Sequence, residues 1–143
     1  MFIRDNCLDF QGDHVLGKRP CAFGAHVAVV EVSRETGHIK ILRYVGIHDA
    51  GTIVNPMLAE GQVHGAVAQG IGQALFEDMA YSPEGQPLAG SLMDYALPRA
   101  DNMPAFTFET METPSPITGL GIKGIGDLPT LAAPPAVVNA VMD

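Results

Sequence analysis

The feature that most constrains this fold is a glycine-bearing stretch from Asn55 to Ala80. It predicts one long helix, because Asn55 is a good N-cap and Pro56 stands at the first helical position, where its missing N–H costs nothing. A glycine in a helix interior costs about 1 kcal/mol relative to alanine. The glycines of this stretch therefore indicate that another backbone or a ligand approaches the helix closely. They are Gly61, Gly65, Gly70 and Gly72.

On a period of about 3.6 residues the predicted helix presents three different faces. The small face comprises Gly61, Gly65, Ala68 and Gly72; the apolar face comprises Val63, Val67, Ala74, Ile71 and Leu75; the amide face comprises Gln62, Gln69 and Gln73. No charge occurs between Glu60 and Glu77, which predicts that the middle is buried on most sides. Because buried amides must be hydrogen-bonded, either loops of the protein or a polar ligand satisfy these glutamines.

Composition indicates a single globular domain with a core of adequate size. The chain has 143 residues, of which 47% are hydrophobic and 17% charged. A net charge of −8 without a Lys/Arg cluster disfavours nucleic acid and anionic membrane surfaces as partners. No apolar run approaches the ~20 residues that span a bilayer, and the first twenty residues lack a signal-peptide core. Cys7 and Cys21 have neither disulfide-framework nor metal-site spacing, so we expect a cytoplasmic protein.

The rest of the chain predicts an α+β fold, with antiparallel strands packed on the long helix. Residues 25–47 predict a β-hairpin whose turn contains Gly37. Alternation in its second strand places Ile39, Ile41, Val45 and Ile47 on the buried face and Lys40, Leu42 and Tyr44 on the other. Two further strands are expected over 88–97 and 106–113. Residues 1–21 are expected to form an irregular N-terminal segment.

A long glycine-rich loop is predicted over residues 113–135, followed by a short helix that nothing caps. Loops of this length within compact domains are usually functional or disordered, and this one is too apolar for disorder. Gly119, Gly121 and Gly124 match G-x-G-x-x-G, but no βαβ unit surrounds them and no acid follows at the spacing of a dinucleotide site. Lys123 is followed by glycine, which removes the Mg²⁺ ligand of a P-loop. The loop instead offers backbone N–H groups to an oxygen-rich ligand.

Few of the titratable side chains form a chemical pattern. The loop ends in Asp127, and an aspartate in such a place is most often a turn or cap residue. His26, His48 and His64 lack metal-ligand spacing and are expected to have hydrogen-bonded structural roles. His48 and Asp49 are adjacent in a strand and therefore point to opposite faces, which disfavours an acid–base pair. Glu60 is interpreted as an acid favoured in the first turn by the helix dipole.

Three motifs together resemble a known family. These are GQVHGAVAQGIGQAL at 61–75, GSLMDYALP at 90–98, and GLGIKGIGD at 119–127 with APPAVVNAV following. They are similar to the C-terminal end of the molybdopterin-binding large subunit of the xanthine dehydrogenases, aldehyde oxidases and carbon monoxide dehydrogenases. The resemblance covers residues 22–143, which are thereby interpreted as a C-terminal molybdopterin-binding domain fragment.

The resemblance implies a cofactor and site residues. Gln62 corresponds to a glutamine that hydrogen-bonds the molybdopterin, and Gly124 and Gly126 belong to the cofactor-binding loop. That loop reads G-x-K-G-x-G-E in the family, and its glutamate is the catalytic base beside the molybdenum. This chain has Asp127 at that position. No protein ligand to the metal is expected from this chain.

The resemblance also implies partners. The family's large subunit is several times longer, so the molybdenum–molybdopterin cofactor is expected only together with an N-terminal part or subunit. Iron–sulfur and FAD groups are expected on other subunits, and an aldehyde or heterocycle as substrate. Nucleic acid and a membrane span are not expected.

Two functional classes remain open. In the first, the chain is a piece of a molybdenum hydroxylase that works only with its partner, and the intact GQVHG helix favours this interpretation. In the second, it is a truncated, catalytically inactive remnant that keeps the fold but has no chemistry of its own. Asp127 and the short, uncapped last helix favour that alternative.

Overall fold

The structure, a computed structural model, describes residues 2–4, 7–9 and 20–143 of the chain. Its elements are β1 (Phe2–Arg4), β2 (Cys7–Asp9), β3 (Phe23–Val32), β4 (Ile39–Asp49), α1 (Pro56–Leu75), the 3-10 helix η1 (Ala100–Asn102), β5 (Phe106–Met111) and α2 (Asp127–Met142). β1 and β2 form a small antiparallel pair. The irregular segment expected over residues 1–21 falls mostly on residues outside this description and stays a prediction.

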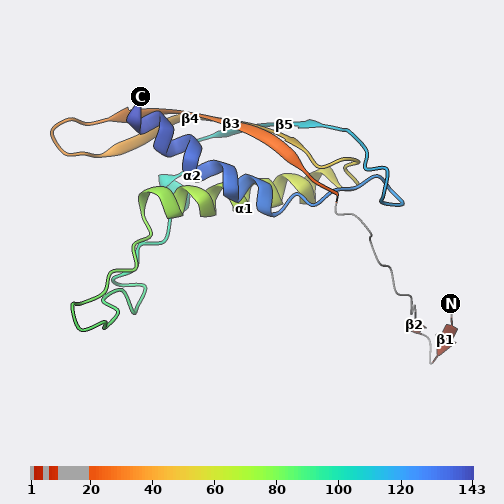
Figure 1. The fold of residues 1–143 in the computed structure, drawn as a ribbon, viewed down its shortest axis with the longest axis horizontal. Helices are drawn as coiled ribbons and strands as arrows, with labels where there is room; N and C mark the ends of the chain where they lie inside the picture. Colours follow the sequence, from red (N-terminus) through yellow and green to blue (C-terminus); the bar gives the residue numbers. More distant parts are fainter. Residues whose placement is uncertain (1, 5–6, 10–19) are drawn as a thin grey trace.

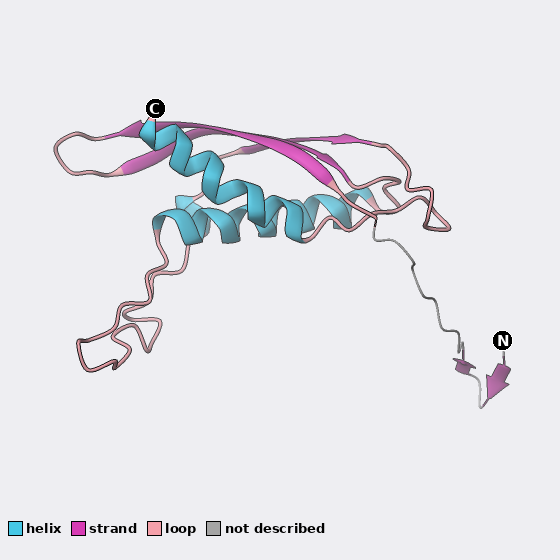
Figure 2. Cartoon of the chain, in the orientation of Figure 1, coloured by secondary structure: helices cyan, strands magenta, loops and turns pink. Residues whose placement is uncertain are grey.

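The main body has two layers, as the α+β prediction requires. One layer is a three-stranded sheet in the order β3-β4-β5, and the other consists of α1 and α2 (Figure 1). Both helices lie against the same face of the sheet, as the cyan and magenta elements of Figure 2 show. The core between the layers comprises Ile41, Tyr44, Val63, Val67, Ile71, Ala133 and Val137. Within the described residues, neither helix is sufficiently long and apolar to cross a membrane.

The predicted hairpin is confirmed, but its buried face is not. β3 and β4 pair antiparallel, and the register shifts where Val29 opposes Arg43 and Val30 opposes Ile41. Leu42 is thus an extra, bulged residue, and a bulge reverses the alternation that follows it.

The reversal changes which residues of β4 face the helices. Tyr44, Gly46 and His48 are buried, whereas Ile47 is 40% exposed and Val45 is half-buried. The predicted inward faces of Val45 and Ile47, and the outward face of Tyr44, are therefore wrong. The sequence pattern does not reveal the bulge.

β5 is present where a strand was predicted, but its direction differs from the prediction. It pairs parallel with β4, from Tyr44 opposite Phe106 to Asp49 opposite Met111. The cause is topological, because α1 carries the chain back along the sheet between β4 and β5, and such a crossover returns the next strand in parallel.

The strand expected over 88–97 is absent, and that prediction is wrong. The segment forms turns, in which the Ser91 hydroxyl donates to Asp94 Oδ2 at 2.9 Å and the Asp94 N–H bonds to the Ser91 carbonyl at 3.0 Å. Tyr95 OH donates to Glu77 Oε2 at 2.6 Å and attaches the segment near the end of α1. The Met93 N–H donates to Ser91 Oγ at 3.2 Å, so a side chain here satisfies a backbone group that a sheet would otherwise pair.

α1 begins as predicted and ends early. Asn55 Oδ1 accepts from the Leu58 N–H at 3.1 Å, and Pro56 is the first helical residue. The helix ends at Leu75 and not at Ala80. The N–H groups of Phe76 and Glu77 both bond to the Gly72 carbonyl, at 2.9 and 2.8 Å, which closes the last turn.

α2 is the largest departure from the predicted structure. It starts at Asp127 and includes Pro134 and Pro135, so the predicted loop over 113–135 is wrong in its second half, and the last helix is not short. An internal proline removes a helix hydrogen bond and costs about 3 kcal/mol or more. Complete burial of Ala133 and Val137 against the core offsets that cost.

The two helices pack closely at Gly70. A Cβ placed there would lie 2.7 Å from Ala133 Cβ and 2.9 Å from the Thr130 carbonyl oxygen. By contrast, a Cβ at Gly61 or Gly65 would meet nothing within 4 Å. The small face was predicted to be a site of close packing. Within this chain that prediction is wrong for Gly61 and Gly65, which form half of the face and lie open.

Candidate functional site

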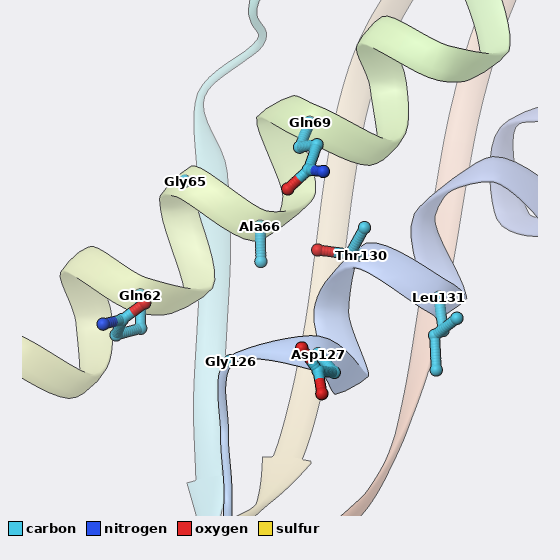
Figure 3. Close-up of a pocket in the computed structure, with 8 residues that line it drawn as sticks. All are labelled: Gln62, Gly65, Ala66, Gln69, Gly126, Asp127, Thr130 and Leu131. Atoms are coloured by element: carbon cyan, nitrogen blue, oxygen red, sulfur yellow. The ribbon is translucent and has the colours of Figure 1, made fainter.

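An open groove of about 440 Å³ lies between the middle of α1 and the start of α2. Figure 3 shows the residues on its two sides. The lining residues are Gln62, Gly65, Ala66, Gln69, Gly126, Asp127, Thr130 and Leu131. Its polar groups are thus two neutral amides, one hydroxyl and one carboxylate.

The α1 side is formed by residues that a helix places on one face. Gln62, Gly65, Ala66 and Gln69 follow the spacing of successive turns. Gln62, Gln69 and Gln73 are all exposed, so the predicted burial of the amides is wrong. In the described part of the chain, the side-chain amides of Gln62 and Gln69 have no hydrogen-bond partner. Val63, Val67 and Ile71 of the uncharged middle are buried in the core. The amides face the groove instead, and the other described residues do not satisfy them.

The α2 side begins at a helix terminus. Gly126 is the N-cap residue, and no side chain caps the first turn. The N–H groups of a first turn have no partner within the helix and carry the positive end of its dipole. Asp127 stands in this turn and is exposed, and its carboxylate makes no hydrogen bond or ion pair to the other described residues. A carboxylate here also stabilises the helix, so Asp127 has a structural explanation beside any chemical one.

The groove brings together three of the four predicted site residues. Gln62, Gly126 and Asp127 line it, whereas Gly124 is exposed and does not. Thr130 and Leu131 were missed, because the sequence placed them in a loop. Their signal is the spacing of 127, 130 and 131, which is that of a helix face, but the two prolines that follow obscure it.

The expected structural roles of His26 and His48 are confirmed. His26 Nδ1 lies 2.6 Å from Tyr44 OH, and His26 Nε2 lies 2.6 Å from His48 Nε2. Burial, and secondarily the neighbouring His48, lowers the pKa of His26 to about 4. Burial also lowers the pKa of His48. Both rings are therefore neutral at neutral pH.

The remaining titratable candidates lie apart from the groove lining. His48 contacts His26, whereas Asp49 bonds to Thr113 and Lys123, so the two adjacent residues diverge as predicted. His64 lies against the rings of Phe106 and Phe108, 3.9 Å from Glu60. Glu60 is in the second turn of α1 and not the first, which corrects its interpretation. Over residues 20–143 and the two short N-terminal strands, no group of His, Cys, Asp and Glu is arranged to hold a metal ion.

The chemistry of the groove follows from its donors. Two unpaired amides can each donate and accept hydrogen bonds, and the first turn of α2 can donate N–H groups to an anion. Gly65 adds no side chain, so a flat group can reach the backbone of α1. The carboxylate of Asp127 can accept hydrogen bonds. The arrangement suits a polar ligand that carries donors, acceptors and negative charge, held against one open wall.

The comparisons with known proteins agree on one family. The molybdopterin cofactor-binding domain matches residues 9–104. The large subunit of nicotine 6-hydroxylase from Paenarthrobacter nicotinovorans is 42% identical over 120 residues, which are 84% of this chain and 15% of that protein. The large chain of carbon monoxide dehydrogenase from Hydrogenophaga pseudoflava is 37% identical over 121 residues, 85% of this chain and 15% of that one.

Solved structures show the same relationship. The crystal structure of Cu,Mo-CO dehydrogenase in its carbon monoxide reduced state matches 85% of this chain with a TM-score of 0.82 and 36% identity. The match covers 15% of that chain. The chain therefore spans about 15% of the length of the relatives that it matches.

Proposed function

Since the chain belongs to the molybdopterin cofactor-binding domain family, we propose that it supplies one wall of the cofactor site of a molybdenum hydroxylase. The matches confirm the resemblance seen in the sequence motifs. The observation that carries the proposal is the groove lined by both Gln62 and Asp127. The resemblance implies from separate motifs that Gln62 binds the cofactor and that Asp127 is the catalytic base. Both residues line the same groove.

The donor set of the groove fits a molybdopterin. A pterin ring system presents hydrogen-bond donors and acceptors in one plane, and the amide of Gln62 offers both kinds of group. Gly65 leaves the α1 backbone open to a flat group. The uncapped first turn of α2 at Gly126 suits an anionic group. We infer that Gln62 and Gly126 hold the cofactor and that Gly124 contacts it from the preceding loop.

The bound molybdenum supplies the redox chemistry of substrate hydroxylation. Within this chain, Asp127 is proposed as the general base, which accepts the proton released during hydroxylation. A general base must come within about 2.6–3.2 Å of the proton that it takes. Aspartate is one methylene shorter than the family's glutamate, so its carboxylate ends on the order of 1 Å short, a misplacement that costs roughly 100-fold in rate. Asp127 therefore supports slow turnover.

The rest of the site is proposed to come from outside these residues. Small-molecule sites usually bury most of their ligand, and one open wall cannot do so. We infer that a further part of the large subunit, or an N-terminal partner subunit, closes the groove over the cofactor. Iron–sulfur and FAD groups on other subunits would carry electrons away, and the substrate would be an aldehyde or a nitrogen heterocycle.

The alternative function, a catalytically inactive remnant, has one observation in its favour. Asp127 stands where the family has glutamate, and a first-turn aspartate needs no catalytic explanation. The other argument for a remnant, a last helix too short to be stable, no longer applies because α2 has 16 residues.

Assembly with the rest of a large subunit separates the two functions. The chain would be produced together with the N-terminal molybdopterin-binding part of a related hydroxylase, and the purified complex assayed for molybdenum and pterin. If the chain forms a wall of the cofactor site, the complex should hold near-stoichiometric cofactor. The N-terminal part alone should retain the cofactor poorly. A remnant predicts no association, or association without any gain in cofactor.

A further inference from the structure

We propose that Asp49 and Lys123 are positioning residues. Their buried ion pair holds the loop over residues 113–126 on the end of β4, and so sets where α2 and Asp127 begin. The positioning itself stands on geometry alone. Its consequence for catalysis rests on the proposed function of Asp127.

The pair is enclosed and has several partners. Lys123 Nζ lies 3.1 Å from Asp49 Oδ1, with side-chain exposures of 9% and 0%. Asp49 Oδ1 also accepts from the Gly51 N–H at 2.8 Å and the Thr113 N–H at 3.3 Å. Thr113 Oγ1 donates to Asp49 Oδ2 and accepts from Lys123 Nζ at 2.8 Å. One carboxylate therefore joins the end of β4 to both ends of the loop.

Backbone contacts reinforce the same junction. The Lys123 N–H bonds to the Ala50 carbonyl at 2.8 Å, and the Thr52 N–H bonds to the Gly121 carbonyl at 3.2 Å. Gly51 and Gly121 have φ of 66° and 72°, and the Gly121 carbonyl occupies the space that a Cβ at Gly51 would need. Two left-handed glycines thus permit the close approach of the loop to the strand end.

The segment between the junction and α2 has little else to hold it. Gly124 and Gly126 have no atom within 4 Å of a Cβ built on them, and Ile125 alone adds a contact to the core. Lys123 is therefore the last strongly bound residue before Asp127. A displacement at Lys123 passes to the start of α2 with few intervening restraints.

Stability alone is a weak explanation for this pair. Burying two charges costs desolvation free energy, and replacing a buried pair by apolar residues is often neutral or stabilising. Its convergent hydrogen bonds specify one geometry, which an apolar contact would not. The Nζ of Lys123 also lies 5.1 Å from the centroid of the Phe23 ring. This ring belongs to β3, so a second strand helps to orient the Lys123 side chain. Lys123, which the sequence excluded as a phosphate-binding lysine, thereby gains a role.

The test is amide hydrogen exchange on the 143-residue chain. Removing one charge would leave the other buried and unpaired and would destabilise the whole chain. The informative variant is therefore the double substitution Asp49→Asn with Lys123→Met. We expect amides of residues 119–128 to exchange about tenfold faster or more, with α1 unchanged. Lys40→Met, which removes an exposed lysine of β4, is the matched control and should change neither region.

Two results would overturn the positioning role. One is exchange in residues 119–128 that stays within about twofold of the starting protein, and the other is equal acceleration in α1, which indicates global destabilisation. In an active complex, the double variant should lower kcat about tenfold or more with KM nearly constant, because α1 still binds the cofactor. Faster loop exchange together with unchanged kcat would retain the positioning role and reject the catalytic assignment of Asp127.

Discussion

Gln62 on α1 and Asp127 in the first turn of α2 line the same groove, although they come from separate motifs (Figure 3). The two helices meet at Gly70, where the Thr130 carbonyl and Ala133 approach α1. This contact joins the two helices beside the groove. Two glycines of α1 therefore have different roles. Gly70 lets the helices pack together, and Gly65 leaves the groove open.

Replacement of Gly70 by alanine should destabilise the fold by about 1–3 kcal/mol, because the new Cβ would overlap Ala133 and the Thr130 carbonyl. The matched control is Gly61→Ala on the same helix, where space is open and the higher helix propensity should add about 0.5–1 kcal/mol. Urea unfolding measures both changes. Equal effects of the two substitutions would contradict the assigned helix contact.

Substitution of Asp127 should separate catalysis from helix stabilisation. In a complex that contains the cofactor, Asp127→Glu should raise kcat by up to roughly 100-fold, and Asp127→Asn should lower it. Asp78→Asn, an exposed aspartate beyond the end of α1, is the control and should leave kcat unchanged. If the glutamate variant is no faster and the asparagine variant no slower, Asp127 serves only the helix terminus.

The neutral His26–His48 pair should make stability depend on pH. Burial, and then the proximity of His48, lowers the pKa of His26 from 6.5 to about 4 in the folded chain. Between these pH values the unfolded chain binds more protons, so the contribution of His26 is complete above pH ~6.5 and is lost progressively as the pH falls toward 4. We expect a loss of about 1–2 kcal/mol, reduced by partial solvent exposure.

Urea unfolding at pH 7.5 and pH 4.5 measures this loss. His26→Gln should remove much of the difference between the two pH values, and His38→Gln, in the exposed turn, should leave it intact. A difference that is the same in both variants would show that other groups cause it.

The chain by itself should associate and should not bind molybdopterin tightly. Val54, Met57 and Leu58 around the start of α1, and Leu131 in the groove lining, have exposures of 69%, 73%, 62% and 74%. Apolar surface of this kind marks an interface, and one open wall supplies too few cofactor contacts. Light scattering over a range of concentrations, with metal analysis, tests both statements. A monomer that carries stoichiometric molybdenum would contradict them.

Local sequence signals predicted the parts of the fold that local physics determines. The cap at Asn55, the proline at Pro56 and the turn at Gly37 predicted the start of α1 and the β3–β4 hairpin correctly. The direction of β5 depends on the crossover through α1, and the buried face of β4 depends on the bulge at Leu42. Neither has a signal within its own strand.

The candidate site was predicted in part for the same reason. Gln62 and Asp127 were named from motifs, but their groove needs α2 to begin at Asp127, and two internal prolines argue against that helix. The burial of Ala133 and Val137 in the folded chain offsets those prolines. Thr130 and Leu131 therefore became site residues only once the tertiary structure was known.

The central claim, that the α1 side of the groove binds the molybdopterin, is tested most directly by the pterin content of the assembled complex. Gln62→Ala is compared with Gln73→Ala, an exposed glutamine of the same helix that does not line the groove. Losing the hydrogen bonds of Gln62 should weaken retention of the cofactor by about tenfold, and the Gln73 variant should retain it like the starting protein. Equal pterin content in all three complexes would contradict the claim.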